Sequence, residues 1–404
     1  MMNKRTVCTG ILWLLFVHIS TGLLAQNSTA FPPLEWKHQQ RIVFLGNSFF
    51  ENEISHGYIE FALSSRWPDA DLVFRNLGWT GDNVFAEARS TFTKPPTAYQ
   101  QLFMQLRSTN PDYVFIAYGG IESQKGEEGL EEFTRGLEVI IDSVDALGAE
   151  TILLSTIPVE RAGNEENTRV QNRNLKTYAD AIRNIAQKRK KRFLDLFQPL
   201  TDHMAGKYAE NGIHLNANGY YFVANVIEKE LKWPERSEKI SIDARQQTAI
   251  EGVNTISFHQ KKIQFTSREK LLPLPATKEG YQEEISSVKI RITGLKKGIY
   301  TLSENGKQLH TASASDWAKG ITLNQGVSVI QAEKIREFIT KKNDLFFQQY
   351  RPLNRTYILG FRAYEQGRHK QGLQDLDFII TWLEGQINVL RKPTTKTYEL
   401  IPVK

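Results

Sequence analysis

The chain has 404 residues and a formal net charge of +6, a mild positive excess for its length. Such a charge fits a mixed, solvated surface better than a nucleic-acid groove, and the one dense basic run, Lys188–Arg192, is explained as an exposed helix end. A chain of this size exceeds one ordinary domain, so two or three domains are expected.

The first 25 residues have the pattern of a secretory signal peptide. Lys4 and Arg5 precede an apolar run that begins at Ile11, and Ala25-Gln26 offers a small-residue cleavage point. An uncleaved N-terminal anchor is the alternative, although the run is short and interrupted for a membrane span. We therefore expect export to the periplasm or the extracellular space, with no stable membrane span after cleavage.

The only cysteine, Cys8, lies before this apolar run, whereas the lipid-bearing cysteine of a lipoprotein would follow it. Cleavage would leave a chain without cysteine, which excludes disulfides and a thiol nucleophile. The histidines are scattered without the spacing of metal ligands, and no phosphate-binding glycine loop occurs. We therefore expect neither a metal nor another cofactor.

From about Arg41 to Trp233, short apolar segments alternate with segments of helical periodicity. The predicted strands are Ile42–Leu45, Leu72–Leu77, Tyr113–Tyr118, Thr151–Thr156 and Arg192–Leu196. The predicted helices are Ser55–Arg66, Thr97–Leu106, Leu130–Leu147, Asn172–Lys188 and Asn218–Leu231. Short apolar strands separated by helices indicate a parallel sheet covered on both faces. Residues 36–235 are thus expected to form a three-layer α/β/α sandwich with a five-stranded parallel sheet.

After Trp233-Pro234 the hydrophobic pattern changes to alternation in twos. The tetrad Glu304-Asn305-Gly306-Lys307 is typical of a type I′ hairpin turn, which needs positive φ at both central positions. We expect a small β-rich module over residues 236–326 and a helical segment over residues 327–404. Helices are predicted at Val327–Tyr350, Thr356–Glu365 and Gln374–Arg391, and their many aromatic residues are best explained by packing against the rest of the protein.

Four stretches that contain candidate catalytic residues fall at the carboxyl ends of predicted strands or in the last loop. Ser48 follows the first strand, Gly78 the second and Gly119–Glu122 the third, while Asn211–His214 precedes the final helix. Ligands bind at that edge of an open α/β sheet. A serine, a glycine amide and a histidine that meet there provide a nucleophile, an oxyanion donor and a general base, as acyl transfer requires.

Each member of this set also has an ordinary explanation. Ser48 could simply cap the helix that follows it. A lone histidine such as His214 is more often a surface or helix-start residue than a catalytic one. Their conjunction, in an order suited to one sheet, is more specific than any single member.

In these stretches the chain resembles the SGNH/GDSL-type hydrolases, a resemblance that spans about Arg41 to Trp233. The family's four blocks are Gly-Asp-Ser, a glycine, Gly-x-Asn-Asp/Glu and Asp-x-x-His, and their matches here are Gly46-Asn47-Ser48, Gly78, Gly119–Glu122 and Asn211–His214. The resemblance implies a flavodoxin-like fold, Ser48 as nucleophile, His214 as base, and the backbone amides of Ser48 and Gly78 as oxyanion donors. We expect four residues of these blocks to bind the substrate: Asn47, Gly120, Glu122 and Asn211.

Three positions depart from the family pattern. Asn47 and Asn211 each stand where the family has Asp, the latter being the Asp that orients the histidine, and Ile121 stands where the family has an Asn that supplies a third oxyanion donor. Loss of one oxyanion donor typically costs about 10²–10³ in rate. An Asp-to-Asn change in a catalytic triad costs about 10⁴.

Another group would then have to hold the imidazole in place of Asn211. The candidate acids are Asp195, at the end of the fifth predicted strand, and Glu122; a backbone carbonyl near Asn211 is the other option. Asp195 has the alternative explanation of a loop or helix cap.

Two functions remain open. The first is an exported serine esterase that removes acyl groups, acetyl above all, from carbohydrate through a Ser48–His214 dyad, and the intact dyad favours it. The second is a catalytically weakened or inactive hydrolase fold that binds glycan. A lipase or thioesterase is a weaker third option, because no long apolar lid is present. The expected partner is a small-molecule or polysaccharide ester and not nucleic acid, and the sequence gives no oligomeric state.

The segments Arg351–Tyr357 and Gly360–Gly367 also resemble, more loosely, the tails of some secreted bacterial SGNH-like proteins. Their polar and aromatic residues could line a sugar-binding cleft. The simpler explanation is a docking segment whose polar groups satisfy one another.

Overall fold

The computed structural model describes residues 31–90, 96–161, 163–203, 207–259, 261–278, 287–352, 364 and 369–403. The predicted signal peptide lies outside these residues, as does most of the segment between Leu353 and Arg368. None of the helices in the described ranges is both long enough and apolar enough to cross a membrane.

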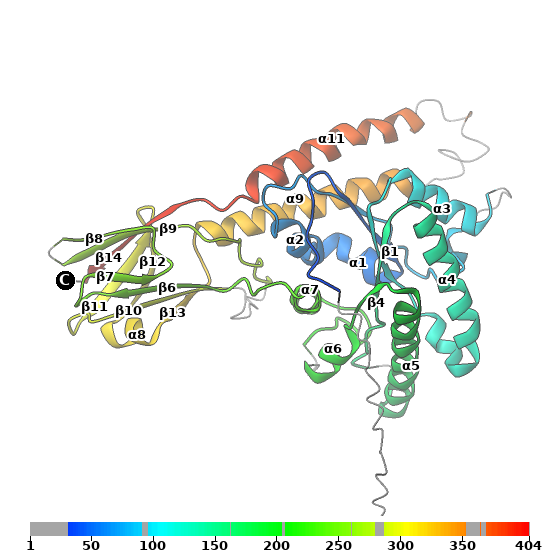
Figure 1. The fold of residues 1–404 in the computed structure, drawn as a ribbon, viewed down its shortest axis with the longest axis horizontal. Coiled ribbons are helices and arrows are strands. Elements are labelled where there is room, and N and C mark those ends of the chain that lie inside the picture. Colours follow the sequence, from blue (N-terminus) through cyan, green and yellow to red (C-terminus); the bar gives the residue numbers. More distant parts are fainter. Residues whose placement is uncertain are drawn as a thin grey trace, which may run out of the picture. The chain divides into compact units, whose positions relative to one another are not determined.

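The first part of the chain is built on a parallel sheet (Figure 1). Its strands are β1 (Arg41–Gly46), β2 (Val73–Asn76), β3 (Tyr113–Ala117), β4 (Glu150–Leu154) and β5 (Arg192–Leu194). They lie in the order β2-β1-β3-β4-β5, which is the flavodoxin-like order. Phe44 of β1 is level with Asn76 of β2 and Phe115 of β3, so these three strands end at one edge of the sheet.

Helices cover both faces of this sheet, which confirms the predicted three-layer sandwich. They are α1 (Ser48–His56), α2 (Tyr58–Ser65), α3 (Ala98–Ser108), α4 (Leu130–Ala146), α5 (Glu165–Arg189), α6 (Phe197–His203) and α7 (Ala217–Glu230), with 3₁₀ segments η1 (Glu87–Arg89) and η2 (Glu122–Gly129). Alternate residues of β1 enter two different cores: Ile42 and Phe44 pack with α2 and α7, whereas Val43 and Leu45 pack with α4. A strand buried on both faces explains the continuous apolar run in the sequence.

Two further sheets follow, as the period-two pattern predicts. One holds β6 (Glu238–Asp243), β7 (Thr248–Glu251), β10 (Val288–Thr293) and β13 (Ile321–Leu323) in the order β13-β10-β6-β7. The other holds β8 (Thr255–His259), β9 (Lys262–Ser267), β11 (Ile299–Glu304), β12 (Lys307–Ser313) and β14 (Lys396–Pro402) in the order β12-β11-β14-β9-β8. The short helix α8 (Ala314–Lys319) precedes β13.

The predicted hairpin turn is confirmed. Asn305 and Gly306 have φ values of 49° and 82°, and they join the antiparallel strands β11 and β12. Positive φ at both central residues is the requirement of a type I′ turn.

The C-terminal segment contains the two long helices α9 (Val327–Tyr350) and α11 (His369–Leu390). They agree with the predicted helices at Val327–Tyr350 and Gln374–Arg391, while most of Thr356–Glu365 falls outside the described residues. The segment is not helical to its end, however. Residues 396–402 form β14 between β9 and β11, and the alternate burial of Lys396, Tyr398 and Leu400 is the period-two signal of a strand.

Helix α9 is docked on the sandwich by a buried polar cluster and an apolar face. Lys342 pairs with Glu60 of α2 at 2.6 Å, and Asn343 donates to the other oxygen of Glu60 at 2.8 Å. On the same helix, Ile335 and Ile339 enter the core that contains α2 and α7. Phe346 is likewise buried in the opposite core, whereas Tyr364 is 82% exposed. Packing thus accounts for Phe346 of α9 but not for Tyr364.

Candidate active site

Ser48 lies at the first turn of α1, directly after β1. The helix is capped by Asn47, whose Oδ1 accepts the N–H of Phe49 at 3.1 Å, so the interpretation of Ser48 as the cap is wrong. Ser48 is half-buried, and within the described part of the chain neither its hydroxyl nor its N–H makes a hydrogen bond. Both groups are therefore available to a substrate.

The turn between β1 and α1 requires glycine at position 46. A Cβ there would lie 2.4 Å from the carbonyl oxygen of Ala117, because β1 and β3 run closely side by side at this point. In a sheet of this strand order, the crevice between β1 and β3 is the switch point where ligands bind. The sequence thus places Ser48 at the opening that the topology provides.

Gly78 follows β2 and packs against α1. A Cβ on Gly78 would lie 2.2 Å from the backbone nitrogen of Glu51, so only glycine fits beside the helix. Its N–H donates to Oδ1 of Asn76 at 2.8 Å, and Nδ2 of Asn76 donates to the Phe50 carbonyl at 2.7 Å. The expected role of the Gly78 amide as an oxyanion donor remains a prediction, and it requires the bond to Asn76 to open.

The end of α9 contacts the loop after β2 that contains Gly78, here called the glycine loop. Sequence reasoning missed this contact. The Tyr350 hydroxyl donates to the Gly78 carbonyl at 2.7 Å. Arg351 pairs with Glu51 of α1 at 2.6 Å and stacks on the Trp79 ring at 4.1 Å. The only signal in the sequence is the aromatic cluster at the end of the predicted helix, and it does not name a partner.

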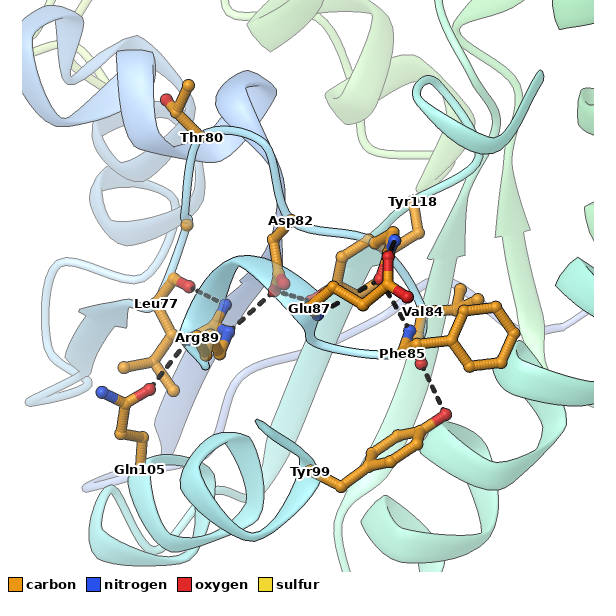
Figure 2. A network of polar contacts seen from close by, with 12 residues as sticks. Leu77, Thr80, Asp82, Val84, Phe85, Glu87, Arg89, Tyr99, Gln105 and Tyr118 are labelled. Carbon is orange, nitrogen blue, oxygen red and sulfur yellow. Dashed lines mark hydrogen bonds and ion pairs between the residues drawn. The ribbon is translucent and has the colours of Figure 1, made fainter. Parts of the chain in front are cut away.

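A buried polar network lies beneath the glycine loop (Figure 2). Arg89 pairs with Asp82 at 2.7 Å and donates to Gln105 at 2.9 Å and to the Leu77 carbonyl at 2.8 Å. The Tyr118 hydroxyl donates to Asp82 at 2.9 Å. Burial raises the pKa of Asp82, and its second oxygen, Oδ1, has no partner in the described structure. The network braces the end of β2, at Leu77, against the end of β3, at Tyr118.

Glu122 holds the loop after β3, which carries the third family block (Gly119–Glu122), in a similar way. Its carboxylate accepts the N–H groups of Val84 and Gly119 at 2.8 and 2.9 Å, and burial raises its pKa. Glu122 therefore holds the loop after β3 and is not hydrogen bonded to His214. The neighbouring Ile121 lines a cavity of about 220 Å³ together with Phe85 and other residues of this loop region.

The loop that carries His214 is shaped by Asn211. Oδ1 of Asn211 accepts the N–H groups of Ile213 and His214 at 3.0 and 2.9 Å, which fixes the orientation of the side-chain amide. Nδ2 then faces Nδ1 of His214 at 3.4 Å. Because Nδ2 can only donate, Nδ1 has to accept, and the imidazole proton is placed on Nε2. A general base needs a free Nε2, so Asn211 favours the wrong tautomer for that role.

Neither candidate acid replaces Asn211. Oδ1 of Asp195 accepts the N–H groups of Phe197 and Gln198 at the start of α6, and its other oxygen pairs with Arg183. The cap interpretation of Asp195 is therefore correct. No hydrogen bond joins Ser48 to His214 among the described residues, and His214 is partly exposed.

A larger cavity borders the histidine loop. It measures about 460 Å³ and is lined by residues 158–161, Thr168, Asn172, Thr201, Ala209, Glu210 and Gly212. The loop is attached there by backbone bonds from Glu160 and Arg161 to the Gly212 carbonyl, at 2.8 and 3.0 Å. Among the described residues, we find no cluster of His, Cys, Asp or Glu side chains that could hold a metal ion.

Known proteins resemble the part of the chain that carries this site. Residues 44–222 match the GDSL-like lipase/acylhydrolase family, a range that includes Ser48, Gly78 and His214. A solved gut microbial diltiazem-metabolizing enzyme is 18% identical, with a TM-score of 0.71 over 91% of this chain and 99% of that one. The acetylxylan esterase Axe2 from Geobacillus stearothermophilus is 16% identical, with a TM-score of 0.39 over 50% of this chain and 97% of its own. No curated protein sequence matches the chain significantly.

Proposed function

Because residues 44–222 match the GDSL-like lipase/acylhydrolase family, we propose that the chain is an exported esterase that removes acetyl groups from carbohydrate. Ser48 and His214 carry the reaction in this proposal. The observation that supports it most is Ser48 itself, at the β1/β3 switch point: its hydroxyl and amide have no hydrogen-bond partner among the described residues, because Asn47 performs the capping.

The reaction follows from these positions. The Ser48 hydroxyl attacks the acyl carbonyl, its proton passes to His214, and the carbonyl oxygen takes the negative charge beside the Ser48 N–H. His214 then returns the proton to the leaving sugar hydroxyl, and a water molecule hydrolyses the acyl-enzyme by the same route. The first proton transfer needs Nε2 of His214 unprotonated, so the contact with Asn211 makes the reaction slower than that of a complete triad.

Export and the carbohydrate substrate rest on the sequence. The N-terminal segment has the pattern of a signal peptide, and an exported esterase without a long apolar lid suits a polar substrate better than a lipid. The orientation of Asn211 is also the observation that favours the alternative, a glycan-binding module in which catalysis has been largely lost.

A comparison of the mature chain with its Ser48→Ala variant separates these functions. The substrates are a small activated acetate ester and acetylated xylo-oligosaccharides, and released acetate is measured. The esterase predicts release that depends on Ser48, and equal release by both proteins would contradict it. Polysaccharide binding that survives Ser48→Ala without acetate release would favour the binding module. A preference for long acyl chains would point to a lipase or thioesterase.

A further inference from the structure

We propose that the side-chain amide of Asn47 is a catalytic oxyanion donor. The inference rests on the proposed esterase reaction and adds a residue to it. It also links two departures from the family pattern, because Asn47 would supply the hydrogen bond that the apolar side chain of Ile121 cannot give.

The orientation of the Asn47 amide is fixed by the helix cap. Oδ1 accepts the N–H of Phe49 at 3.1 Å, so Nδ2 has to point away from the helix. Asn47 is only 7% exposed, yet Nδ2 makes no hydrogen bond with any described residue. Nδ2 is not among the fully enclosed atoms, so it remains open to an incoming group. An accessible donor on an otherwise buried residue, without a partner in the described structure, is a candidate for binding a group that is not part of the protein.

The amide points toward the loop after β3. A Cβ placed on Gly120 would lie 3.5 Å from Nδ2, so Nδ2 faces this loop one residue before Ile121. The absence of a side chain at Gly120 leaves the space in front of the donor open. Nδ2 therefore lies between the start of α1 and the loop of the third block, next in sequence to the free N–H of Ser48.

This placement suits an oxyanion. When the Ser48 hydroxyl adds to the acyl carbonyl, the carbonyl oxygen gains a negative charge that needs hydrogen-bond donors. The Ser48 N–H supplies one, and Nδ2 of Asn47 supplies a second without transferring its proton. An Asp at position 47 could still cap α1 but would place only acceptors there.

The test uses Asn47→Asp and Asn47→Ser, which both keep a capping oxygen and remove the amide donor. Hydrolysis of an activated acetate ester is measured as kcat and KM, together with the melting temperature. We expect kcat to fall by about 10²-fold in both variants with little change in KM, as for loss of one oxyanion donor. Asn164→Ser is the matched control, because Asn164 caps α5 through the same type of bond, 2.8 Å to the N–H of Asn167. Its activity should not change.

A rescue experiment distinguishes donation from capping. Ile121→Asn returns an amide to the neighbouring loop, so it should raise kcat more in the Asn47→Ser background than in the wild type. An equal gain in both backgrounds would overturn the inference. So would Ser48-dependent activity that is unchanged in both Asn47 variants, and that result would leave the esterase function intact. Equal rates for wild type and Ser48→Ala would overturn the function and the inference together.

Discussion

Ser48 and His214 are held by surroundings of different kinds. Around Ser48, α1 is capped by Asn47, the glycine loop beside it is packed against the helix, and Tyr350 of α9 bonds that loop from outside. His214 stands on a partly exposed loop that is held by the Asn211 side chain and by backbone bonds at Gly212 and at His214 itself, and that borders a cavity of about 460 Å³. The nucleophile half of the site is thus preorganised by buried contacts, whereas the imidazole ring of the base half is oriented by a single amide.

This difference has a physical consequence for mutation. Buried polar groups depend on one another, so removal of one partner leaves another unpaired in a low-dielectric interior. An exposed loop can exchange its partners for water at little cost. Changes near Ser48 should therefore affect stability and activity together, and changes near His214 should affect activity alone.

The largest effect is expected from Asn211→Asp. One carboxylate oxygen can keep the bonds to the N–H groups of Ile213 and His214, while the other accepts a hydrogen bond from Nδ1–H and so leaves Nε2 unprotonated. We expect kcat for an acetate ester to rise by up to about 10⁴-fold, since the reverse change in a serine protease triad costs that much. The combination with Ile121→Asn should raise it further.

Asn211→Ser is the control for this change, because it retains an acceptor for the turn but cannot orient the imidazole. Retained structure without any increase in rate would show that His214 does not act as the base.

The contrast between the two halves also explains which features could be predicted from the sequence. The five strands were predictable because burial on both faces leaves a continuous apolar run, and the Asn305-Gly306 turn because few residues tolerate positive φ. Periodicity could not decide whether Asn47 or Ser48 caps α1, since both residue types are good caps. Contacts between distant segments, such as Lys342 with Glu60, have no local signature in one sequence.

The next largest effect is expected on stability, from Arg89→Met. The change leaves Asp82 buried and without its charge partner, and it removes the donors to Gln105 and the Leu77 carbonyl. Breaking such a buried pair costs about 3–5 kcal/mol. The urea midpoint should fall accordingly, while Arg107→Met, at an exposed arginine of α3, should leave it nearly unchanged. A similar midpoint for both variants would show that the network does not brace the site.

Glu53 of α1 gives a pH-dependent test of the nucleophile half of the site. Burial raises the pKa of Glu53 well above its usual value, and one of its oxygens has no partner among the described residues. The pKa of a Glu side chain in the unfolded chain is about 4.3. Below this pH, a carboxyl whose pKa is raised by folding contributes its full stabilisation, and that stabilisation is lost as the pH rises through the pKa of the folded protein.

The melting temperature of the wild type should therefore decline from acidic to neutral pH more steeply than that of Glu53→Gln, whose side chain cannot ionise. Glu127→Gln, at an exposed position of η2, should follow the wild-type curve. Parallel curves for wild type and Glu53→Gln would contradict the assignment.

The smallest effect is expected from Tyr350→Phe, which removes only the bond from α9 to the Gly78 carbonyl. A neutral hydrogen bond of this type contributes about 0.5–1.5 kcal/mol. If the bond positions the glycine loop for the reaction, most of that energy should be lost in the transition state, and kcat should fall up to about tenfold with KM unchanged.

Tyr300→Phe removes a comparable bond, from its hydroxyl to the Lys296 carbonyl at 3.0 Å, within the β sheets and away from the glycine loop. This control should lose similar stability without any change in kcat. Equal losses of kcat in the two variants would mean that Tyr350 acts through general stability. A loss confined to Tyr350→Phe would show that the C-terminal helix takes part in preorganising the nucleophile half of the site.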